Sequence, residues 1–199
     1  MPAPSRTTHG DIVAAARGIV AAGGLEALTM QAVATRVGVR APSLYKRIAG
    51  RTELIRLVVV AVIDDLERRL ASAAALVARD PRGAIADLAR ELRAFAHADP
   101  SGFGLIFGGA PLDARPPVDV LARSAAPLID AARRLVGEER ALDAARTLTA
   151  WANGFLTMEL AGAFQLGGDV DRAFEWGLAR VIDAVAADEP HDSKAARRH

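Results

Sequence analysis

The chain of 199 residues contains no cysteine, which excludes a disulfide framework, a catalytic thiolate and a zinc site built on cysteine. Long apolar runs are also missing. The longest aliphatic run, Leu57 to Ile63, is far short of the roughly 20 residues that a membrane-spanning helix needs. The first residues, MPAPSRTTHGD, lack the apolar segment of a secretory signal. We therefore expect a protein of the cytoplasm.

The motifs of common enzyme classes are absent as well. The sequence has no G-x-S-x-G and no H-E-x-x-H, and of its four histidines only His97 is far from the chain ends. The glycines at 102, 104 and 108 do not follow a strand and lack the Lys and Ser or Thr of a phosphate-binding loop. We predict a protein that is not an enzyme and that binds no metal and no cofactor.

Runs of β-branched residues are few, whereas alanine is abundant and apolar residues recur at helical spacing. Apolar residues make up 51% of the chain, which is enough for a substantial core at this length. These features predict an all-α fold of about nine helices. We expect a first helical domain over 8–54, a second helical domain over 55–187, and a disordered polar tail over 188–199.

Charge is distributed unevenly along the chain. Residues 1–56 carry eight basic and three acidic side chains, a net charge of +5, whereas residues 57–199 carry 17 basic and 21 acidic side chains, a net charge of −4. A basic N-terminal region on a mildly acidic body indicates that one end of the molecule meets a polyanion.

The stretch from Thr29 to Arg51 has the pattern of two short helices around a tight turn. Thr29 stands where an N-cap belongs, and Gly38 supplies a residue that accepts positive φ in the turn. Pro42 suits the first turn of the second helix, which we expect to run from Pro42 to Arg47. Between a surface helical hairpin and a DNA-binding helix-turn-helix, the spacing alone does not decide.

The second helix of this stretch has two distinct faces. Leu44 and Ile48 are predicted to face the core. The opposite face is basic and hydroxyl-bearing, which suits a helix in the major groove, and it comprises Ser43, Tyr45, Lys46 and Arg47.

Two C-terminal segments carry more apolar surface than one core-facing stripe requires. We expect helices over about 138–166 and over 169–187, and the first contains the small residues Gly154, Ala161 and Gly162. Small residues allow another helix to approach closely, so the pair predicts a homodimer interface. The alternative is that both helices are buried in the centre of a monomer.

The chain resembles the TetR family of bacterial transcriptional regulators. The resemblance rests on the order of its elements and on LTMQAVATRVGVRAPSLYKRIAGRTELI, and it covers residues 8 to 56. Further on, Trp151-Ala152-Asn153-Gly154-Phe155 is similar to a C-terminal domain type marked by Trp-His-Gly, with Asn153 in place of the histidine.

This resemblance implies a homodimer whose two recognition helices enter successive major grooves of a palindromic operator. The geometry agrees, because a helix of six residues contacts too few bases alone and a second copy about 34 Å away is needed. Phosphate contacts are implied for Thr29, Tyr45 and Arg51. Contacts with base edges or the adjoining backbone are implied for Arg40, Ala41, Pro42, Ser43 and Lys46.

The resemblance also implies a repressor that is released by a small apolar effector. Large aromatic residues dominate such pockets, so the expected lining is Phe95, Phe103, Phe107, Trp151 and Phe155. The alternative function is a helical ligand-binding or interaction protein that does not bind DNA.

Overall fold

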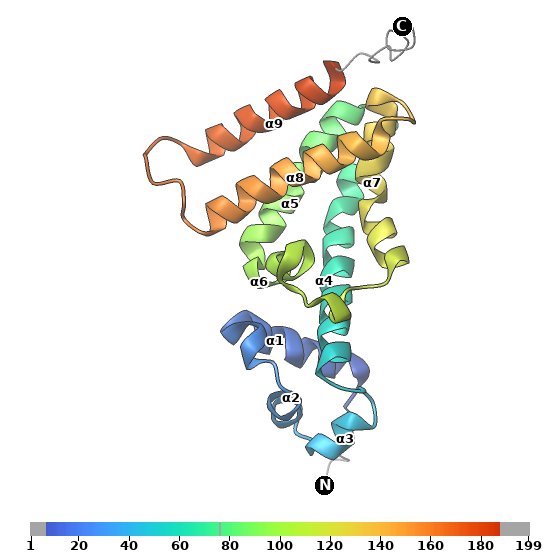
Figure 1. The fold of residues 1–199 in the computed structure, drawn as a ribbon, viewed down its shortest axis with the longest axis vertical. Helices are drawn as coiled ribbons and strands as arrows, with labels where there is room; N and C mark the ends of the chain where they lie inside the picture. The colour runs from blue at the N-terminus through green and yellow to red at the C-terminus, as the bar shows by residue number, and fades with distance from the viewer. Residues whose placement is uncertain (1–6, 76, 188–199) are drawn as a thin grey trace, which may run out of the picture. The chain divides into compact units, whose positions relative to one another are not determined.

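The computed structural model describes residues 7–75 and 77–187, and this part of the chain folds almost entirely into helices and their connections (Figure 1). These residues form nine α-helices, a π-helical segment and a 3-10 turn, and they contain no strand. The prediction of an all-α fold with about nine helices is confirmed. No helix in these ranges is both long and apolar enough to cross a bilayer.

The helices follow one another through short connections. The first four are α1 (His9–Ala27), α2 (Met30–Arg36), α3 (Ala41–Tyr45) and α4 (Arg51–Ala74). They are followed by α5 (Pro81–Ala98), α6 (Pro100–Gly104), the π-helical η1 (Leu105–Gly109), the 3-10 turn η2 (Leu112–Ala114), α7 (Val118–Val136), α8 (Ala141–Leu160) and α9 (Val170–Ala187).

The helices group into two compact units. The first consists of the described residues up to Arg69 together with Ala94–Ser124, and the second of Leu70–Arg93 together with the described residues from Ala125 onwards. The two predicted domains, 8–54 and 55–187, are divided by expected function and not by compactness. Their boundary stays a prediction. The predicted tail, 188–199, lies outside the described residues.

In the first unit, α1 begins with a reciprocal cap. The Thr8 hydroxyl accepts the Asp11 N–H at 3.1 Å, and the Thr8 N–H donates to the Asp11 carboxylate at 2.7 Å. Ile12 and Ala16 are fully buried on the inner face of the helix. The Gly23-Gly24 pair predicts a helix end. The helical geometry is interrupted at Gly24, before the last residues of α1.

Helix α4 differs from its prediction at both ends. The helical spacing of apolar residues predicts a helix that is capped by Thr52 and runs to about Arg79, but α4 runs from Arg51 to Ala74. The residues from 77 to 79 form turns, and the Asp80 carboxylate accepts the Gly83 N–H at 2.9 Å, which starts α5. The apolar residues keep their helical spacing through this turn. Their spacing therefore does not reveal where α4 ends.

Helix α8 also ends earlier than predicted, at Leu160 rather than at Leu166. Gly162 has φ +65°, its N–H donates to Glu159 O at 2.9 Å, and the Ala163 N–H donates to Met158 O at 2.9 Å. These two bonds form a Schellman motif, which satisfies the last carbonyls of a helix through a glycine in the left-handed conformation. The stop is therefore at Gly162, and Gly167-Gly168 belongs to the loop before α9.

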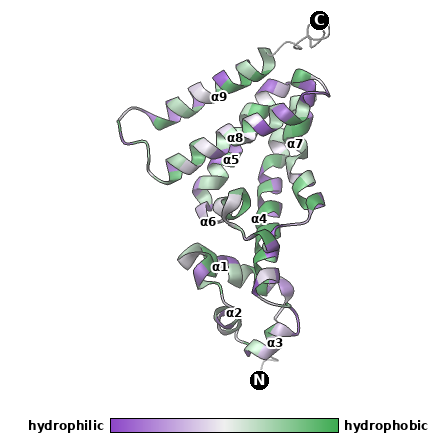
Figure 2. Ribbon diagram, in the orientation of Figure 1, coloured by the Kyte–Doolittle hydropathy of each residue, from purple (hydrophilic) through white to green (hydrophobic). Residues whose placement is uncertain are grey.

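The second unit has a core of small residues and an aromatic cluster. Ala132, Ala144 and Ala145 are buried where α7 packs near α8, and hydrophobic and hydrophilic residues alternate along the long helices (Figure 2). The aromatic cluster joins α8, the α8–α9 loop and α9, with ring centroids 4.9 to 5.7 Å apart, and consists of Trp151, Phe155, Phe164 and Phe174.

Helix α9 lies very close to α8 at one glycine. A Cβ atom at Gly177 would lie 2.7 Å from Cζ2 of the Trp151 indole, well inside van der Waals contact. Gly177 is the single glycine of α9. The absence of a side chain at this position therefore makes room for the indole.

An arginine ties α5 to both ends of the α8–α9 loop within the second unit. Arg93 donates from Nε to Glu159 at 3.0 Å and from Nη2 to Asp171 at 2.6 Å. Its guanidinium carbon lies 4.7 Å from the centroid of the Phe174 ring. One charged side chain thus holds two acidic partners and covers the most buried aromatic ring of the cluster.

One turn away, Arg90 pairs with Glu175 of α9 through both carboxylate oxygens, at 2.9 and 2.8 Å. The hydrogen bonds from Arg90 lower the pKa of Glu175 below its ordinary value. Both side chains are about half exposed, so solvent weakens the pair.

Replacing Glu175 with Gln should reduce the free energy of unfolding at neutral pH by a few tenths to about 1 kcal/mol. A carboxylate with a lowered pKa in the folded state stabilises the fold above its unfolded pKa, about 4.3 for Glu. This stabilisation is lost as the pH falls through the folded-state pKa. In thermal unfolding, the Tm difference between wild type and E175Q should therefore narrow toward zero below about pH 4.

The control for this measurement is Glu139→Gln, which removes an exposed carboxylate from the same unit. It should show no such narrowing. A Tm difference for E175Q that stays constant from neutral to acid pH would contradict the prediction.

Candidate nucleic-acid interface

Helices α2 and α3 meet at a turn that the sequence predicts well. The Thr29 hydroxyl accepts the Ala32 N–H at 3.1 Å and caps α2. Gly38 has φ +72°, and the next residue, Val39, donates its N–H to Ala34 O at 2.9 Å. The N-cap at Thr29 and the positive φ at Gly38 are both confirmed.

Helix α3 is short, and two buried side chains hold it in place. Leu44 is 1% exposed and Ile48 is fully buried. The helix spans Ala41–Tyr45 instead of the predicted Pro42–Arg47, because the chain turns at 46 and 47. The Glu53 carboxylate accepts the Ala49 N–H and closes the corner between α3 and α4.

The outer face of the α2–α3 unit presents the predicted DNA-contacting residues to solvent. Tyr45 is 55% exposed, while Ala41 is half-buried at the first position of α3. The other predicted residues with exposed side chains on this part of the chain are Thr29, Arg40, Pro42, Ser43 and Lys46. Their contacts with DNA stay predictions.

Arg51 has a role within the domain that the sequence did not indicate. Its Nε donates to Leu28 O at 2.8 Å and its Nη2 donates to Leu25 O at 2.6 Å. These bonds tie the start of α4 to the end of α1 and the segment before α2. The phosphate contact implied for Arg51 stays a prediction, and substitution of Arg51 would also remove this tie.

Two further arginines near the interface were missed as structural residues. The Arg47 Nη1 donates to Thr7 O at 2.6 Å, and the Arg36 guanidinium lies where a Cβ atom at Gly18 would be 2.9 Å from Nη2. A glycine inside the alanine-rich α1 was a usable signal of close approach at Gly18. No pattern in the sequence points to the Arg47 bond.

The five predicted pocket residues fall into two groups. Phe95 and Phe103 are buried in the first unit, where the rings of Phe103 and Phe107 are 4.8 Å apart. Trp151 and Phe155 belong to the second unit, with ring centroids 5.7 Å apart. The Phe103–Phe107 pair and the Trp151–Phe155 pair are each brought together within one unit, and a shared effector pocket stays a prediction.

The second unit contains a hollow of about 600 Å³ beside Trp151 and Phe155. This volume is within the range of small-molecule pockets, about 300 to 1,000 Å³. The α8–α9 loop and α9 contribute further lining residues, among them Phe164, Arg172 and Trp176. The sequence prediction did not include Phe164 or Trp176 among the pocket residues.

Two family models match the chain. Residues 12–58 match bacterial regulatory proteins of the tetR family, and residues 85–181 match the tetracyclin repressor-like C-terminal domain. An uncharacterized HTH-type transcriptional regulator of Mycobacterium tuberculosis is 30% identical over 195 residues, which cover 96% of this chain and 88% of that protein. The chain belongs to the TetR family.

Solved structures are similar to this TetR-family protein over most of its length. BioQ of Mycobacterium smegmatis is 26% identical, with a TM-score of 0.68, and the match covers 91% of this chain and 99% of that chain. A TetR variant from Acinetobacter baumannii AYE, solved in complex with minocycline, is 22% identical with a TM-score of 0.64. That match covers 90% of this chain and 96% of the other, and it shows the shared fold.

Membership of the TetR family makes the protein a helix-turn-helix transcriptional regulator and not an enzyme. The N-terminal match begins in α1 and ends in α4, so it includes the whole α2–α3 unit. The C-terminal match includes Trp151 and Phe155. The predicted family and the predicted absence of enzymatic activity are therefore confirmed.

The turn of the helix-turn-helix can be tested through its backbone alone. A Cβ atom at Gly38 would meet no atom within 4 Å, so Gly38→Ala should destabilise the protein by roughly 1–2 kcal/mol only because alanine disfavours positive φ. Asparagine accepts positive φ better than alanine does, so Gly38→Asn should destabilise the protein less. Tm from thermal unfolding measures both.

Gly104→Ala is the matched control, because its Cβ atom also meets open space while its φ of −58° is helical. It should be neutral or slightly stabilising. Equal losses at positions 38 and 104 would show that the positive φ at Gly38 is not the constraint.

Proposed function

We propose that this protein is a ligand-responsive repressor that binds a palindromic operator as a homodimer in the cytoplasm. The observation that carries the proposal is the exposed polar and basic face of α3, held in place by the buried Leu44 and Ile48. A short helix with an anchored inner face and an exposed outer face fits the major groove. Family membership supports the same interpretation.

The exposed side chains divide by chemistry into two roles. Thr29 and Tyr45 carry hydroxyl groups at the edges of the face and would donate to phosphates, together with Arg51. Arg40 and Lys46 are the exposed basic residues at the two ends of α3, and either would donate to guanine in the major groove. Ala41, Pro42 and Ser43 would lie against base edges or the adjoining backbone.

Homodimerisation through α8 and α9 is proposed from the exposed face of α8. From residue 147 to its end, the exposed positions of this helix carry no charge, and Met158 is 49% exposed. A Cβ atom at Gly154 would meet nothing within 4 Å, although glycine in a helix costs about 1 kcal/mol relative to alanine. On α9, Trp176 is 69% exposed. A second copy packed on this face would bury these residues.

The proposed effector is a small apolar molecule. The aromatic hollow beside Trp151 and Phe155 has a suitable volume. The first unit contains the Phe103–Phe107 pair and the buried Phe95. A TetR variant of the same fold was solved with minocycline, a small organic ligand. The effector would release the operator only through a difference in its affinity for the DNA-binding and released states.

The competing hypothesis is a helical ligand-binding or interaction protein that does not contact DNA. The aromatic hollow favours ligand binding, but it is equally compatible with a DNA-binding regulator. Only a measurement with DNA separates the two functions.

Binding of the protein to the DNA upstream of its own coding sequence should weaken steeply as salt rises. Lys46→Ala removes one exposed cation from each recognition helix. If Lys46 contacts a phosphate, the slope of log K against log salt should decrease by about 1 for each phosphate that is no longer neutralised. Fluorescence anisotropy over a salt series measures affinity and slope together.

Arg134→Ala is the matched control, because it removes an exposed positive charge from α7 in the second unit. It should leave the slope nearly unchanged. Binding that is independent of salt, or equal effects of the two substitutions on the affinity for DNA, would favour the alternative function. Arg51→Ala is less informative, because it also breaks the bonds to Leu25 and Leu28.

Gly154→Leu tests the dimer face without weakening the helix. In an isolated subunit, the leucine should stabilise α8 by up to about 1 kcal/mol, because its helix propensity is higher and the space is open. In the proposed dimer, the same side chain would hold the two copies apart. Light scattering after size exclusion should therefore show wild type as a dimer and the variant as a monomer with an intact helical CD spectrum.

The exposed Ala122→Leu on α7 provides a control of similar size outside the proposed face. It should leave the molar mass unchanged. A dimeric Gly154→Leu protein, or a monomeric wild type at micromolar concentration, would contradict the proposed interface.

A further inference from the structure

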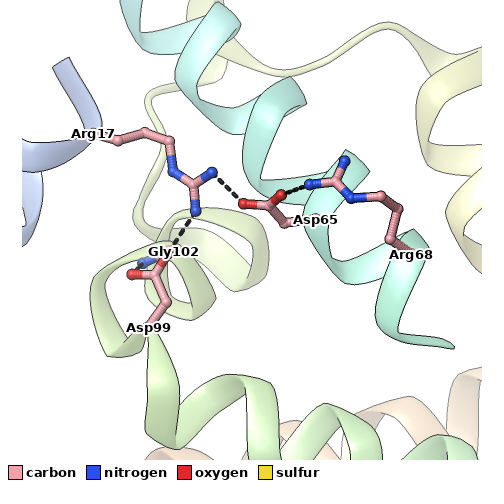
Figure 3. Close-up of polar contacts among 5 residues, drawn as sticks. All are labelled: Arg17, Asp65, Arg68, Asp99 and Gly102. Carbon is pink, nitrogen blue, oxygen red and sulfur yellow. Dashed lines mark hydrogen bonds and ion pairs between the residues drawn. The ribbon is translucent and has the colours of Figure 1, made fainter. Parts of the chain in front are cut away.

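Arg17 of α1 holds two carboxylates that belong to different elements of the first unit (Figure 3). Its Nη1 pairs with Asp65 of α4, and its Nη2 lies 3.2 Å from Oδ2 of Asp99, which joins α5 to α6. The three side chains are only 26 to 30% exposed, so solvent screens them less than it screens surface pairs. We refer to Arg17, Asp65 and Asp99 as the Arg17 clamp.

Asp99 has a second task in the clamp. Its Oδ1 accepts the Gly102 N–H at 2.8 Å, so the same carboxylate that binds Arg17 also caps α6 (Figure 3). The first turn of α6 therefore cannot move without moving the group that Arg17 holds.

Helix α6 packs tightly against α4 at Gly102. A Cβ atom at Gly102 would lie 2.9 Å from Cγ1 of Val62 and closer still to the Asp99 carboxylate. The remaining space beside Arg17 and Gly102 is a cavity of about 10 Å³, room for one water at most. Because this cavity is so small, a displacement of α6 would also displace the residues packed against it.

Besides binding the two carboxylates through Arg17, α1 packs against α2, and α2 packs against the recognition helix α3. Directly after Arg17, Gly18 admits the Arg36 side chain at the end of α2. The position of α1 therefore determines where α2 and α3 lie within the first unit.

We propose that Arg17 is a positioning residue that couples α6 to the recognition helix. While Asp99 is held, α1–α3 keep the arrangement that binds DNA, and a displaced first turn of α6 releases Arg17 and weakens DNA binding. The inference rests on the proposed function and names the contact that regulates it. If the position of α6 determines that of α1–α3, a disturbance of α6 changes the affinity for DNA even without an effector.

Adding a side chain at position 102 would disturb α6 without an effector. Gly102→Ala should lower the affinity for the DNA upstream of the coding sequence about fivefold or more, and Arg17→Ala should lower it by a similar factor. The double variant should bind no more weakly than either single variant, because both changes open the same clamp. Gly104→Ala, whose Cβ atom meets open space, should leave the affinity unchanged.

Asp99→Asn separates the clamp from simple electrostatics. Asparagine retains an oxygen that caps α6, but it loses the charge that binds Arg17. The substitution also makes the protein more positive, which by itself would strengthen DNA binding. The clamp predicts a weakening of at least about twofold. The control is Arg68→Ala, because the ion pair of Arg68 with Asp65 joins two residues of α4 that are three positions apart.

Additive losses in Gly102→Ala and Arg17→Ala, or tighter binding by Asp99→Asn, would overturn the inference. If Gly102→Ala does not fold, hydrogen exchange decides: DNA should slow exchange of the amides of residues 101–106 in wild type but not in Arg17→Ala. Equal slowing in both proteins would also overturn it. Wild type that fails to bind the upstream DNA would overturn the proposed function, and the inference with it, whereas bound DNA with additive losses would overturn the inference alone.

Discussion

The burial of Leu44 and Ile48 is the constraint on which the DNA-binding end of the molecule depends. A helix of five residues is not stable in water by itself, so α3 keeps its shape only because these two side chains are held in the core. The cap at Thr29 and the turn at Gly38 fix the direction from which the chain enters the helix. The outer face of α3 is therefore as rigid as the core beneath it, which is what a specific contact with base edges requires.

Several arginines of the N-terminal region make hydrogen bonds within the protein. A count over residues 1–56 gives a net charge of +5, but it treats every arginine as available to a partner. Arg17 binds carboxylates, while the guanidinium groups of Arg47, Arg51 and Arg56 donate to backbone carbonyls. These arginines keep their positive charge, but their donors are engaged within the protein, so the proposed direct contacts with DNA rest chiefly on Arg40 and Lys46 at the two ends of α3.

The sequence predicts those features that depend on neighbours a few positions apart. The helix at Thr29, the turn at Gly38 and the buried positions of α3 follow from such local patterns. The predicted end of α8 was wrong because two glycine sites could stop the helix, and backbone geometry selects Gly162 over Gly167. Ion pairs such as Arg17 with Asp65 join residues 48 positions apart, and in a chain with many arginines and carboxylates only tertiary packing selects the partner.

The contact between Gly177 and Trp151 has a consequence for how the second unit can move. A shift of α9 along α8 by one turn would replace Gly177 opposite the indole with Ala173 or Val181, and either side chain would collide with it. The two helices can separate or tilt, but they cannot slide past one another. The α8–α9 pair therefore has a single register, so any surface built from both helices is presented as one fixed pattern.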